Sequence, residues 1–457
     1  MVFSSVIFLF FFLPAVYIMY CLCSDIRMKN ALLIMASLFF YAFGEPVYVI
    51  LMTGSILTNY AMARLIASYQ KRTRIFLCMA VVFNLGLLVF FKYAALIIQT
   101  IRGLSVGQSS CPEIALPIGI SFYTFQALSY CVDVYRDRGL VQKNVWKLML
   151  YISFFPQLIA GPIVKYHDIE KQLSDRAVTI GDTAVGIRRF ICGLGKKLLI
   201  ANSMAYIVDT LYTTQINMAL TAWVSAVCYI FQIYFDFSGY SDMAIGLGRM
   251  FGFTFQENFQ YPYVSTGIRE FWRRWHISLS TWFKEYLYIP LGGNRKGKVR
   301  TTLNKLVVFM ATGIWHGADW TFLLWGLFHG LFITLEDHGL VPFKNRISAH
   351  IYTMFVIICG FVIFRADTIG QAVHIFGAMF TGFHMEVVEM MILAKLLTPW
   401  NVACAIVAAV LSTPVSCWLK QTIKNEAVYY TASLVLLAVC IMELASGSYN
   451  PFIYFRF

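Results

Sequence analysis

Charged side chains are scarce in this sequence, and their scarcity excludes an ordinary soluble globular protein. Of the 457 residues 13% are charged and 59% are hydrophobic. The hydrophobic residues gather in stretches of about 20, the length that crosses bilayer hydrocarbon as a helix. We therefore predict an all-α integral membrane protein, a polytopic helical bundle of roughly 10–12 transmembrane or re-entrant segments. No segment is polar enough for a separate soluble domain, so residues 1–457 are expected to form one integral membrane domain.

The common motifs of soluble enzymes are also missing. The sequence contains no HExxH zinc motif, no Walker loop and no GxSxG nucleophile elbow. Its 11 cysteines form no framework, and Cys21 and Cys23 lack the second pair and the histidines that a zinc site needs. No metal site and no bound cofactor are therefore expected. Val2–Leu22 has no Lys or Arg before it and no clear cleavage site, so it is predicted to be an uncleaved first helix.

Acidic residues are fewer than basic ones: the sequence has 23 of the former and 36 of the latter, which gives a net charge of +13. The basic residues cluster between apolar stretches, as at Lys196-Lys197, Arg269–Arg274 and Arg295–Arg300. This pattern is typical of cytoplasmic loops that contact anionic lipid headgroups. One cluster could in addition receive a phosphate-bearing donor from the cytosol. Nucleic-acid binding is not expected, because the basic residues separate membrane segments and form no single patch.

The longest apolar stretch, Leu303–Leu335, has a histidine near its middle. A straight helix of that length would span about 50 Å, against about 30 Å of bilayer hydrocarbon. A break is therefore predicted near Gly313, Gly317 and Asp319, which would place His316 near the membrane midplane. Ionisable groups and broken backbone at that depth are tolerated where they face protein or a cavity. His316 is accordingly a candidate for chemistry inside the membrane.

A second candidate lies in the aromatic and basic segment Phe271–Arg295. At helical spacing Phe271, Trp275, Leu279, Trp282 and Tyr286 would share one face, and Trp272, His276 and Ser280 another. An interfacial amphipathic helix with aromatic anchors would explain this pattern. Alternatively, His276 lines the cytosolic mouth of a reaction tunnel together with Trp272, Arg273 and Arg274, with Asn294 on the cytosolic side.

Two further segments carry unusual residues within apolar surroundings. Asp236 and Asp242 end a long apolar run, with Ser238, Tyr240 and Ser241 between them. One carboxylate is explained by an exposed helix end, whereas two suggest a buried polar network beside a cavity. Phe154–Val164 contains two prolines and a glycine, so it cannot form one regular helix and is predicted to be re-entrant and packed against protein.

These segments together resemble the membrane-bound O-acyltransferase (MBOAT) family, in its bacterial alginate O-acetyltransferase-like branch. The long match over Phe271–Arg295 is the most specific, whereas Trp315–Gly317 alone would be weak. Teichoic-acid D-alanyl transfer proteins share the architecture and the histidine, but Leu291–Arg295 favours the acetyltransferase branch. The remaining resembling segments are Leu116–Gln126, Phe154–Val164, Asp236–Gly252 and Asn450–Phe457.

The resemblance implies a helical bundle around a central tunnel in the bacterial cell membrane. It implies that His316 is the essential catalytic histidine and that His276 matches a second polar position. The acyl donor would be a cytosolic thioester, acetyl-CoA or an acyl-carrier protein, and the acceptor an extracellular or cell-wall polysaccharide. An exported SGNH-hydrolase-like partner would complete the transfer to the polysaccharide.

Three alternatives remain open at this stage. The chain could transfer D-alanine to teichoic acid, act as a transporter or flippase without chemistry of its own, or only assemble an export complex. Broken helices and midplane polar groups also mark transporters, although no inverted repeat is visible. Trp315, with Trp320, Phe322 and Trp325, crowds the region of the break with bulky rings, which favours a short acyl group such as acetyl.

Overall fold

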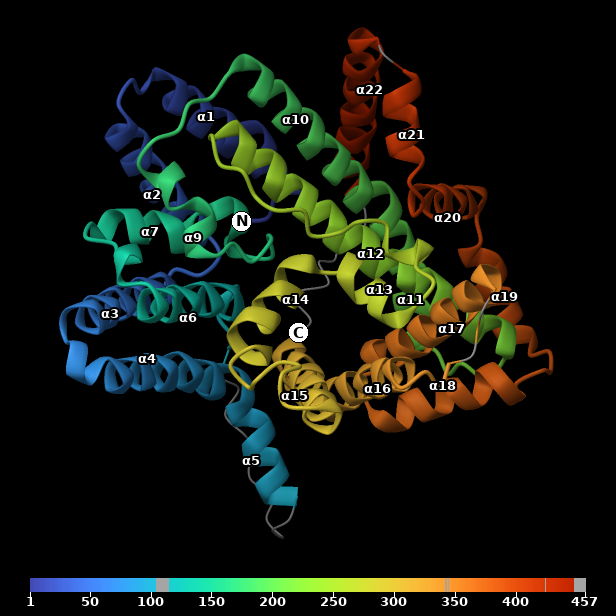
Figure 1. Cartoon of the computed structure of the whole chain (residues 1–457). Helices are drawn as coiled ribbons and strands as arrows, with labels where there is room; N and C mark the ends of the chain where they lie inside the picture. Colours follow the sequence, from blue (N-terminus) through green and yellow to red (C-terminus); the bar gives the residue numbers. More distant parts are fainter. Residues whose placement is uncertain (104–114, 342, 344, 424, 448–457) are drawn as a thin grey trace. The chain divides into compact units, whose positions relative to one another are not determined.

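The computed structural model describes residues 1–103, 115–341, 343, 345–423 and 425–447, and these residues form helices and no strands (Figure 1). The predicted all-α class is therefore confirmed. Of the segments named above, Asn450–Phe457 lies outside the described residues.

The chain separates into two compact units. The first comprises Met1–Phe190 with Met243–Gln256, and the second Ile191–Asp242 with Glu257–Phe457. The boundaries fall inside α10 (Ile180–Gly195) and α12 (Ala219–Met250), so two helices contribute to both units. The single-domain organisation over residues 1–457 stays a prediction.

In the first unit α3, α4 and α6 lie side by side, and α2 packs on α7 (Figure 1). The bounds of the helices of this unit are α1 Leu13–Leu22, α2 Ile26–Ala42, α3 Tyr48–Ser68, α4 Thr73–Leu88, α5 Ala94–Gly103, α6 Ile120–Arg136, α7 Val145–Ser153, α8 Phe155–Leu158 and α9 Tyr166–Ile169.

In the second unit α15 packs along α16, and α16 packs on α17 (Figure 1). The bounds of its helices are α11 Asn202–Thr213, α13 Ile268–Arg274, α14 Ile277–Phe283, α15 Lys298–His316, α16 Trp320–Asp337, α17 Arg346–Arg365, α18 Ile369–Thr381, α19 Val387–Leu396, α20 Pro399–Leu411, α21 Val415–Thr422 and α22 Glu426–Ala445.

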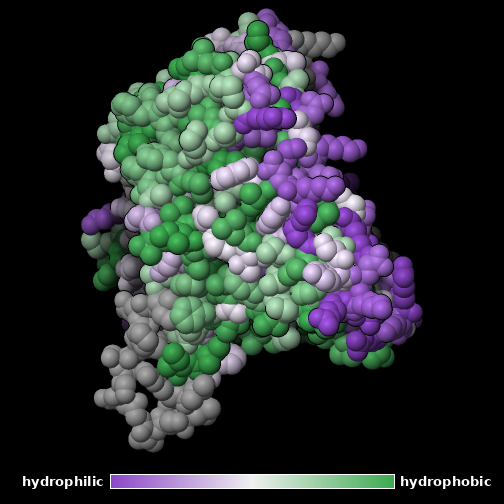
Figure 2. Space-filling view, turned by 90° about the vertical axis from the view of Figure 1, so that its left-hand side faces the viewer, coloured by the Kyte–Doolittle hydropathy of each residue, from purple (hydrophilic) through white to green (hydrophobic). Residues whose placement is uncertain are grey.

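The chain is a multi-pass membrane protein by the length and composition of its helices. Within the described residues six helical segments are long and apolar enough to cross a membrane, or seven if the bent pair Val387–Leu396 and Pro399–Leu411 counts as one span. The sequence prediction of 10–12 also counted re-entrant and shorter apolar segments. Hydrophobic side chains cover most of the face drawn in Figure 2, and hydrophilic ones gather along its right-hand edge. The six segments are Tyr48–Ser68, Gln70–Ile98, Ile180–Thr213, Ala219–Met250, Arg346–Arg365 and Glu426–Ala445.

The predicted break in the longest apolar stretch is confirmed. Helix α15 ends at His316, and α16 begins at Trp320, where the Asp319 side chain accepts a hydrogen bond from the main-chain N–H of Thr321. The two helices approach so closely that a Cβ on Gly313 would lie 2.3 Å from the carbonyl oxygen of Phe322. The glycine therefore permits the helix contact that sets the position of His316.

The segment Phe154–Val164 is irregular, as its prolines predict. Helix α7 ends at Ser153, the four-residue helix α8 follows, and residues 154–164 are all buried. The hydroxyl of Tyr151 donates to the carbonyl oxygen of Val164 at 2.9 Å, which satisfies one main-chain acceptor of this stretch.

The helical spacing through Phe271–Tyr286 does not belong to one continuous helix. The chain breaks between α13 and α14, because Trp275 is extended and His276 adopts left-handed backbone angles (φ 44°, ψ 56°). The interfacial-helix alternative is also not supported, since Phe271, Trp275, Leu279 and Trp282 are buried inside the protein. Their aromatic spacing reflects core packing of two short helices and not membrane anchoring.

Candidate active site

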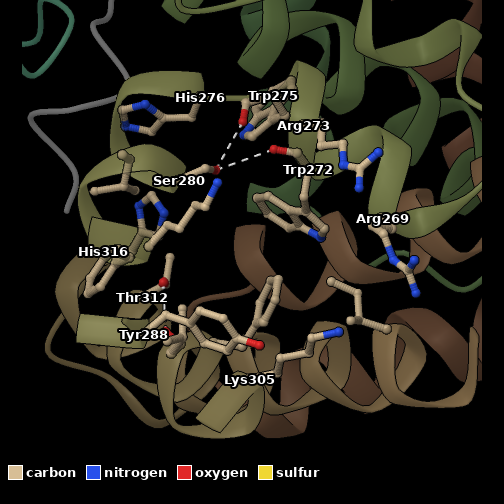
Figure 3. A pocket seen from close by; sticks show the side chains of 16 residues that line it. Arg269, Trp272, Arg273, Trp275, His276, Ser280, Tyr288, Lys305, Thr312 and His316 are labelled. Atoms are coloured by element: carbon tan, nitrogen blue, oxygen red, sulfur yellow. Dashed lines mark hydrogen bonds between the residues drawn. The ribbon is translucent and has the colours of Figure 1, made fainter. Parts of the chain in front are cut away.

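The second unit contains a cavity of about 430 Å³ whose wall includes both candidate histidines (Figure 3). Its lining residues come from α13, from the break at His276, from α14, from the π-helical turn Lys284–Tyr288 that follows it, and from α15 and α16. The Ser280 hydroxyl, which has one proton to donate, lies within hydrogen-bond distance of the carbonyl oxygens of Trp272 (3.3 Å) and Trp275 (3.5 Å) and so ties α14 to α13 across the break. π-helical turns are often found at functional sites.

His316 is the last residue of α15, and its side chain reaches the cavity from the helix end. Its ring packs edge-on against Trp325 and Phe364, each with a centroid distance of 5.2 Å. Only 8% of the residue is exposed. The next residue, Gly317, has no room for a side chain, because a Cβ there would lie 2.0 Å from the ring of Phe322. Aromatic packing on both sides therefore fixes the imidazole in place.

His276 faces the same cavity from the break between α13 and α14. Its ring stands at right angles to that of Phe237, 4.5 Å away, and only 2% of the residue is exposed. His276 lies outside the six helical segments that are long and apolar enough to cross a membrane. Burial, with a smaller contribution from His316, lowers the pKa of His276 well below its ordinary value. The imidazole is therefore neutral near pH 7.

Four cationic side chains line the cavity with the histidines. Arg269 and Lys305 both form ion pairs with Asp337, and Figure 3 shows them on the side away from His276 and His316. For Arg273 and Lys284, by contrast, the described part of the chain provides no ion pair. These two cations are thus available to an anionic ligand.

The structure places Asp236 and Asp242 in ion pairs outside the cavity wall. Lys197 Nζ lies 2.7 Å from Asp236 Oδ1, with both side chains buried, and Lys196 Nζ lies 2.7 Å from Asp242 Oδ2. Only the Asp236 pair is buried, whereas Asp242 is half-buried, and neither carboxylate lines the cavity. Both lysines lie on a π-helical turn (Lys196–Ala201) and pair with carboxylates of α12. Headgroup contact is therefore the wrong interpretation for the buried Lys197.

The remaining predicted site residues are distributed unevenly. Trp272 and Arg273 line the cavity. Arg274 instead forms an ion pair with Glu270, in which its Nη2 lies 2.8 Å from Oε1 of the carboxylate. Trp315 is buried between the two histidines in ring contacts, with centroids 6.1 Å from His276 and 5.0 Å from His316. Asn294 is exposed on the loop before α15 and does not line the cavity.

Sequence reasoning missed several residues of this region. Thr312 lies one turn before His316 on α15, and Tyr288 lies on the π-helical turn; both line the cavity. His329 is fully buried against Trp272 (5.0 Å) and Trp325 (5.1 Å). The repeated His-Gly at 316–317 and 329–330 was a signal in the sequence that could have drawn attention to His329.

Comparison with known proteins places this geometry in a family. A model of the membrane-bound O-acyltransferase family matches residues 142–340, a range that contains every residue of the cavity wall. A probable alginate O-acetylase, AlgI, of Pseudomonas putida is 38% identical to the chain over the full length of both proteins. The chain belongs to the membrane-bound O-acyltransferase family. It is accordingly an O-acyltransferase embedded in a membrane.

Two further relatives of this acyltransferase act on different polymers, as their names state. A peptidoglycan O-acetyltransferase of Helicobacter pylori is 32% identical over all of the chain and 98% of its own length. A teichoic acid D-alanyltransferase of Bacillus subtilis is 30% identical over 54% of the chain and 68% of its own length. The similarity to the O-acetyl-transferring relatives thus extends over the whole chain.

Proposed function

We propose that this acyltransferase moves an acetyl group from a cytosolic thioester, acetyl-CoA, across the membrane for the O-acetylation of an extracellular or cell-wall polysaccharide. The observation that carries the proposal is one cavity that holds His316, His276 and two cations, Arg273 and Lys284, which have no ion pair among the described residues. A neutral imidazole and an anion-binding wall are the two features that transfer from such a donor requires.

In the proposed reaction a hydroxyl oxygen of the immediate acceptor, the exported partner introduced below, attacks the carbonyl carbon of the thioester. The imidazole of His316 takes the hydroxyl proton as the C–O bond forms. The C–S bond then breaks, and the proton passes from the imidazolium to the leaving thiolate, so that the histidine ends neutral. The aromatic rings around His316 limit access of water, which would otherwise compete for the acyl group.

The charges of the cavity wall support a phosphate-bearing donor. Guanidinium and ammonium groups form strong charge-assisted hydrogen bonds with phosphate oxygens. Arg273 is exposed, so it can meet a donor at the entrance, while Lys284 lies one helical turn beyond Ser280. Arg269 and Lys305, already neutralised by Asp337, would add less.

A small acyl group suits the bulky surroundings of His316, where Trp315, Trp325 and Phe364 occupy the nearby space. Because the sequence has no serine nucleophile elbow, we further propose that an exported SGNH-hydrolase-like partner hands the acyl group to the polysaccharide. The bacterial relatives support a location in the cytoplasmic membrane of a bacterium.

The test uses the purified full-length protein in liposomes that are supplied with the exported partner and the polysaccharide acceptor. Radiolabelled acetyl-CoA, palmitoyl-CoA and a D-alanyl carrier protein are offered in turn, and both thiol release and label transfer are measured. We expect turnover with acetyl-CoA and little with palmitoyl-CoA. Exclusive use of the carrier protein would instead assign the chain to D-alanyl transfer, and no turnover with any thioester would contradict an acyl-transfer function.

A further inference from the structure

The backbone of His276 is held in an unfavourable conformation. Its φ of 44° makes it one of two described non-glycine residues with positive φ, the other being Tyr261. A left-handed conformation is unfavourable for a non-glycine residue, so the surroundings must fix it. The contacts that do so come largely from one residue, Asn258.

Asn258 binds the break with both its main chain and its side chain. Its carbonyl oxygen accepts the main-chain N–H of Ile277 (2.9 Å). Its side-chain Oδ1 accepts the main-chain N–H of Ser278 (3.2 Å) and lies 3.1 Å from Nδ1 of His276. Its Nδ2 donates to the hydroxyl of Ser241 (3.1 Å). All of these residues belong to the second unit.

These contacts determine the tautomer of His276. A main-chain N–H can only donate, so the atom that faces Ser278 N must be the amide oxygen of Asn258. The same oxygen faces Nδ1 of His276, which must therefore carry the proton of the neutral ring. Nε2 is then left with a lone pair and acts as a hydrogen-bond acceptor.

Nε2 of His276 has no hydrogen-bond partner among the described residues, although it is buried and its ring lines the cavity. A buried acceptor without a partner is costly, and a ligand that donates a hydrogen bond removes this cost. The arm that acetyl-CoA shares with acyl-carrier proteins contains amide N–H groups. An imidazolium could not accept such a bond, because both of its ring nitrogens are donors.

We propose that Asn258 is a positioning residue of this acyltransferase, which holds His276 as the Nδ1–H tautomer so that Nε2 accepts an amide N–H of the thioester donor's arm. This inference rests on the proposed function, since it names the part of the donor that His276 binds. It applies to acetyl-CoA and to a carrier-protein donor alike.

Few titratable groups surround His276. His316 faces it from α15, and Arg273 and Lys284 line the same cavity from α13 and from the turn after α14. On α12, which supplies Phe237, the carboxylates Asp236 and Asp242 are neutralised by Lys197 and Lys196. No carboxylate of the described chain hydrogen-bonds His276, so the ring stays neutral over the usual assay range.

The experiment replaces the amide with a carboxylate. Asn258→Asp keeps an oxygen acceptor for Nδ1 and Ser278, but its negative charge raises the pKa of His276 toward the assay range. The KM for acetyl-CoA should then rise as the pH falls from 8 to 6, by about tenfold per pH unit below the new pKa. In the wild type the KM should change little, and kcat of the variant should fall much less than KM rises.

Asn345→Asp is the matched control, because the oxygen of Asn345 likewise accepts a main-chain N–H, that of Ile347, and Asn345 does not line the cavity. Its KM should follow the wild type at every pH. If Asn258→Asp does not accumulate, Ser241→Ala takes its place in the experiment. This change removes the hydrogen bond that holds the Asn258 amide and leaves His276 untouched. It should raise the KM for acetyl-CoA severalfold. A pH-independent KM in Asn258→Asp, or a wild-type KM in Ser241→Ala, would overturn the inference. Thioester turnover by the wild type, measured in parallel, separates that result from failure of the proposed function.

Discussion

Two buried histidines share one cavity, but their surroundings differ. The ring of His316 is packed among Trp315, Trp325 and Phe364, whereas His276 is held through a hydrogen bond to Asn258. Rigid aromatic packing keeps the imidazole of His316 in place while substrates exchange. His316 is thus the residue on which turnover should depend most.

His316→Ala is expected to lower kcat for acetyl transfer by ~10³-fold, because proton transfer by a positioned imidazole contributes on the order of 10²–10⁴. Expression and membrane insertion should remain normal, as the loss leaves a small space beside Trp325. His338→Ala, at the exposed end of α16, is the control and should retain wild-type turnover. Near-normal kcat in His316→Ala would refute the assignment.

His167, in the first unit, provides a prediction about pH. Its Nδ1 lies 2.9 Å from Asp133 Oδ2, and this hydrogen bond, opposed in part by burial, raises the pKa of His167 above its ordinary value. A raised pKa stabilises the fold below the pKa of the unfolded chain, about 6.5, and the gain is lost as pH rises through the folded pKa. His167→Gln should therefore lower the melting temperature more at pH 5.5 than at pH 8.5. An equal loss at both pH values, with His338→Gln as reference, would show that the charge contributes nothing.

At the scale of elements, one helix break could be predicted and the other could not. The break after His316 followed from length alone, because Leu303–Leu335 exceeds the bilayer thickness and contains glycines. The break at His276 has no local signal: Trp275-His276 contains neither glycine nor proline. It depends on hydrogen bonds from Asn258, 18 residues earlier, and such a tertiary contact is invisible to helical periodicity.

The close approach of α15 and α16 should be sensitive to a single methyl group. Gly313→Ala would place a Cβ 2.3 Å from the main-chain oxygen of Phe322, which cannot move without shifting α16. We expect a destabilisation of about 2 kcal/mol and reduced turnover, because the adjoining His316 is displaced. The readouts are the melting temperature in detergent and the rate of thiol release.

Gly54→Ala is the matched control for this change. Gly54 also lies within a helix, α3, but its Cβ would meet no atom within 4 Å. There the substitution should be neutral or stabilise by up to ~1 kcal/mol through helix propensity. Equal effects of the two substitutions would exclude helix contact as the cause.

At the scale of the whole molecule, composition alone predicted the membrane location and the all-α class, since little else accommodates 59% hydrophobic residues. The partition of charge was harder to predict. The arginines of Arg269–Arg274 could not be told apart in the sequence, yet Arg273 lines the cavity with no ion pair in the described part of the chain, while Arg274 binds Glu270. Only the fold decides which basic residues are neutralised.

The orientation of the protein in the membrane is testable at two exposed positions of the second unit. Asn294 precedes α15, which packs along α16. Asp367 follows α17, a 20-residue helix that starts beside the end of α16 and is long enough to cross the membrane. The two positions should therefore lie on opposite sides. In a variant without the 11 native cysteines, Asn294→Cys should react with impermeant maleimide only from the cytosol, and Asp367→Cys only from outside. Labelling of Asn294→Cys from outside would reverse the donor route.

Every residue of the cavity wall lies between Arg269 and Ile333, so one continuous stretch of 65 residues encodes the chamber that we propose for the reaction. In many enzymes such a chamber is assembled from distant parts of the chain and can diverge only by scattered point mutations. Here a single recombination event within a gene could exchange the whole chamber between relatives and leave the surrounding helices unchanged. Donor preference and polymer choice could then be inherited separately, which would suit a family whose named members modify alginate, peptidoglycan and teichoic acid.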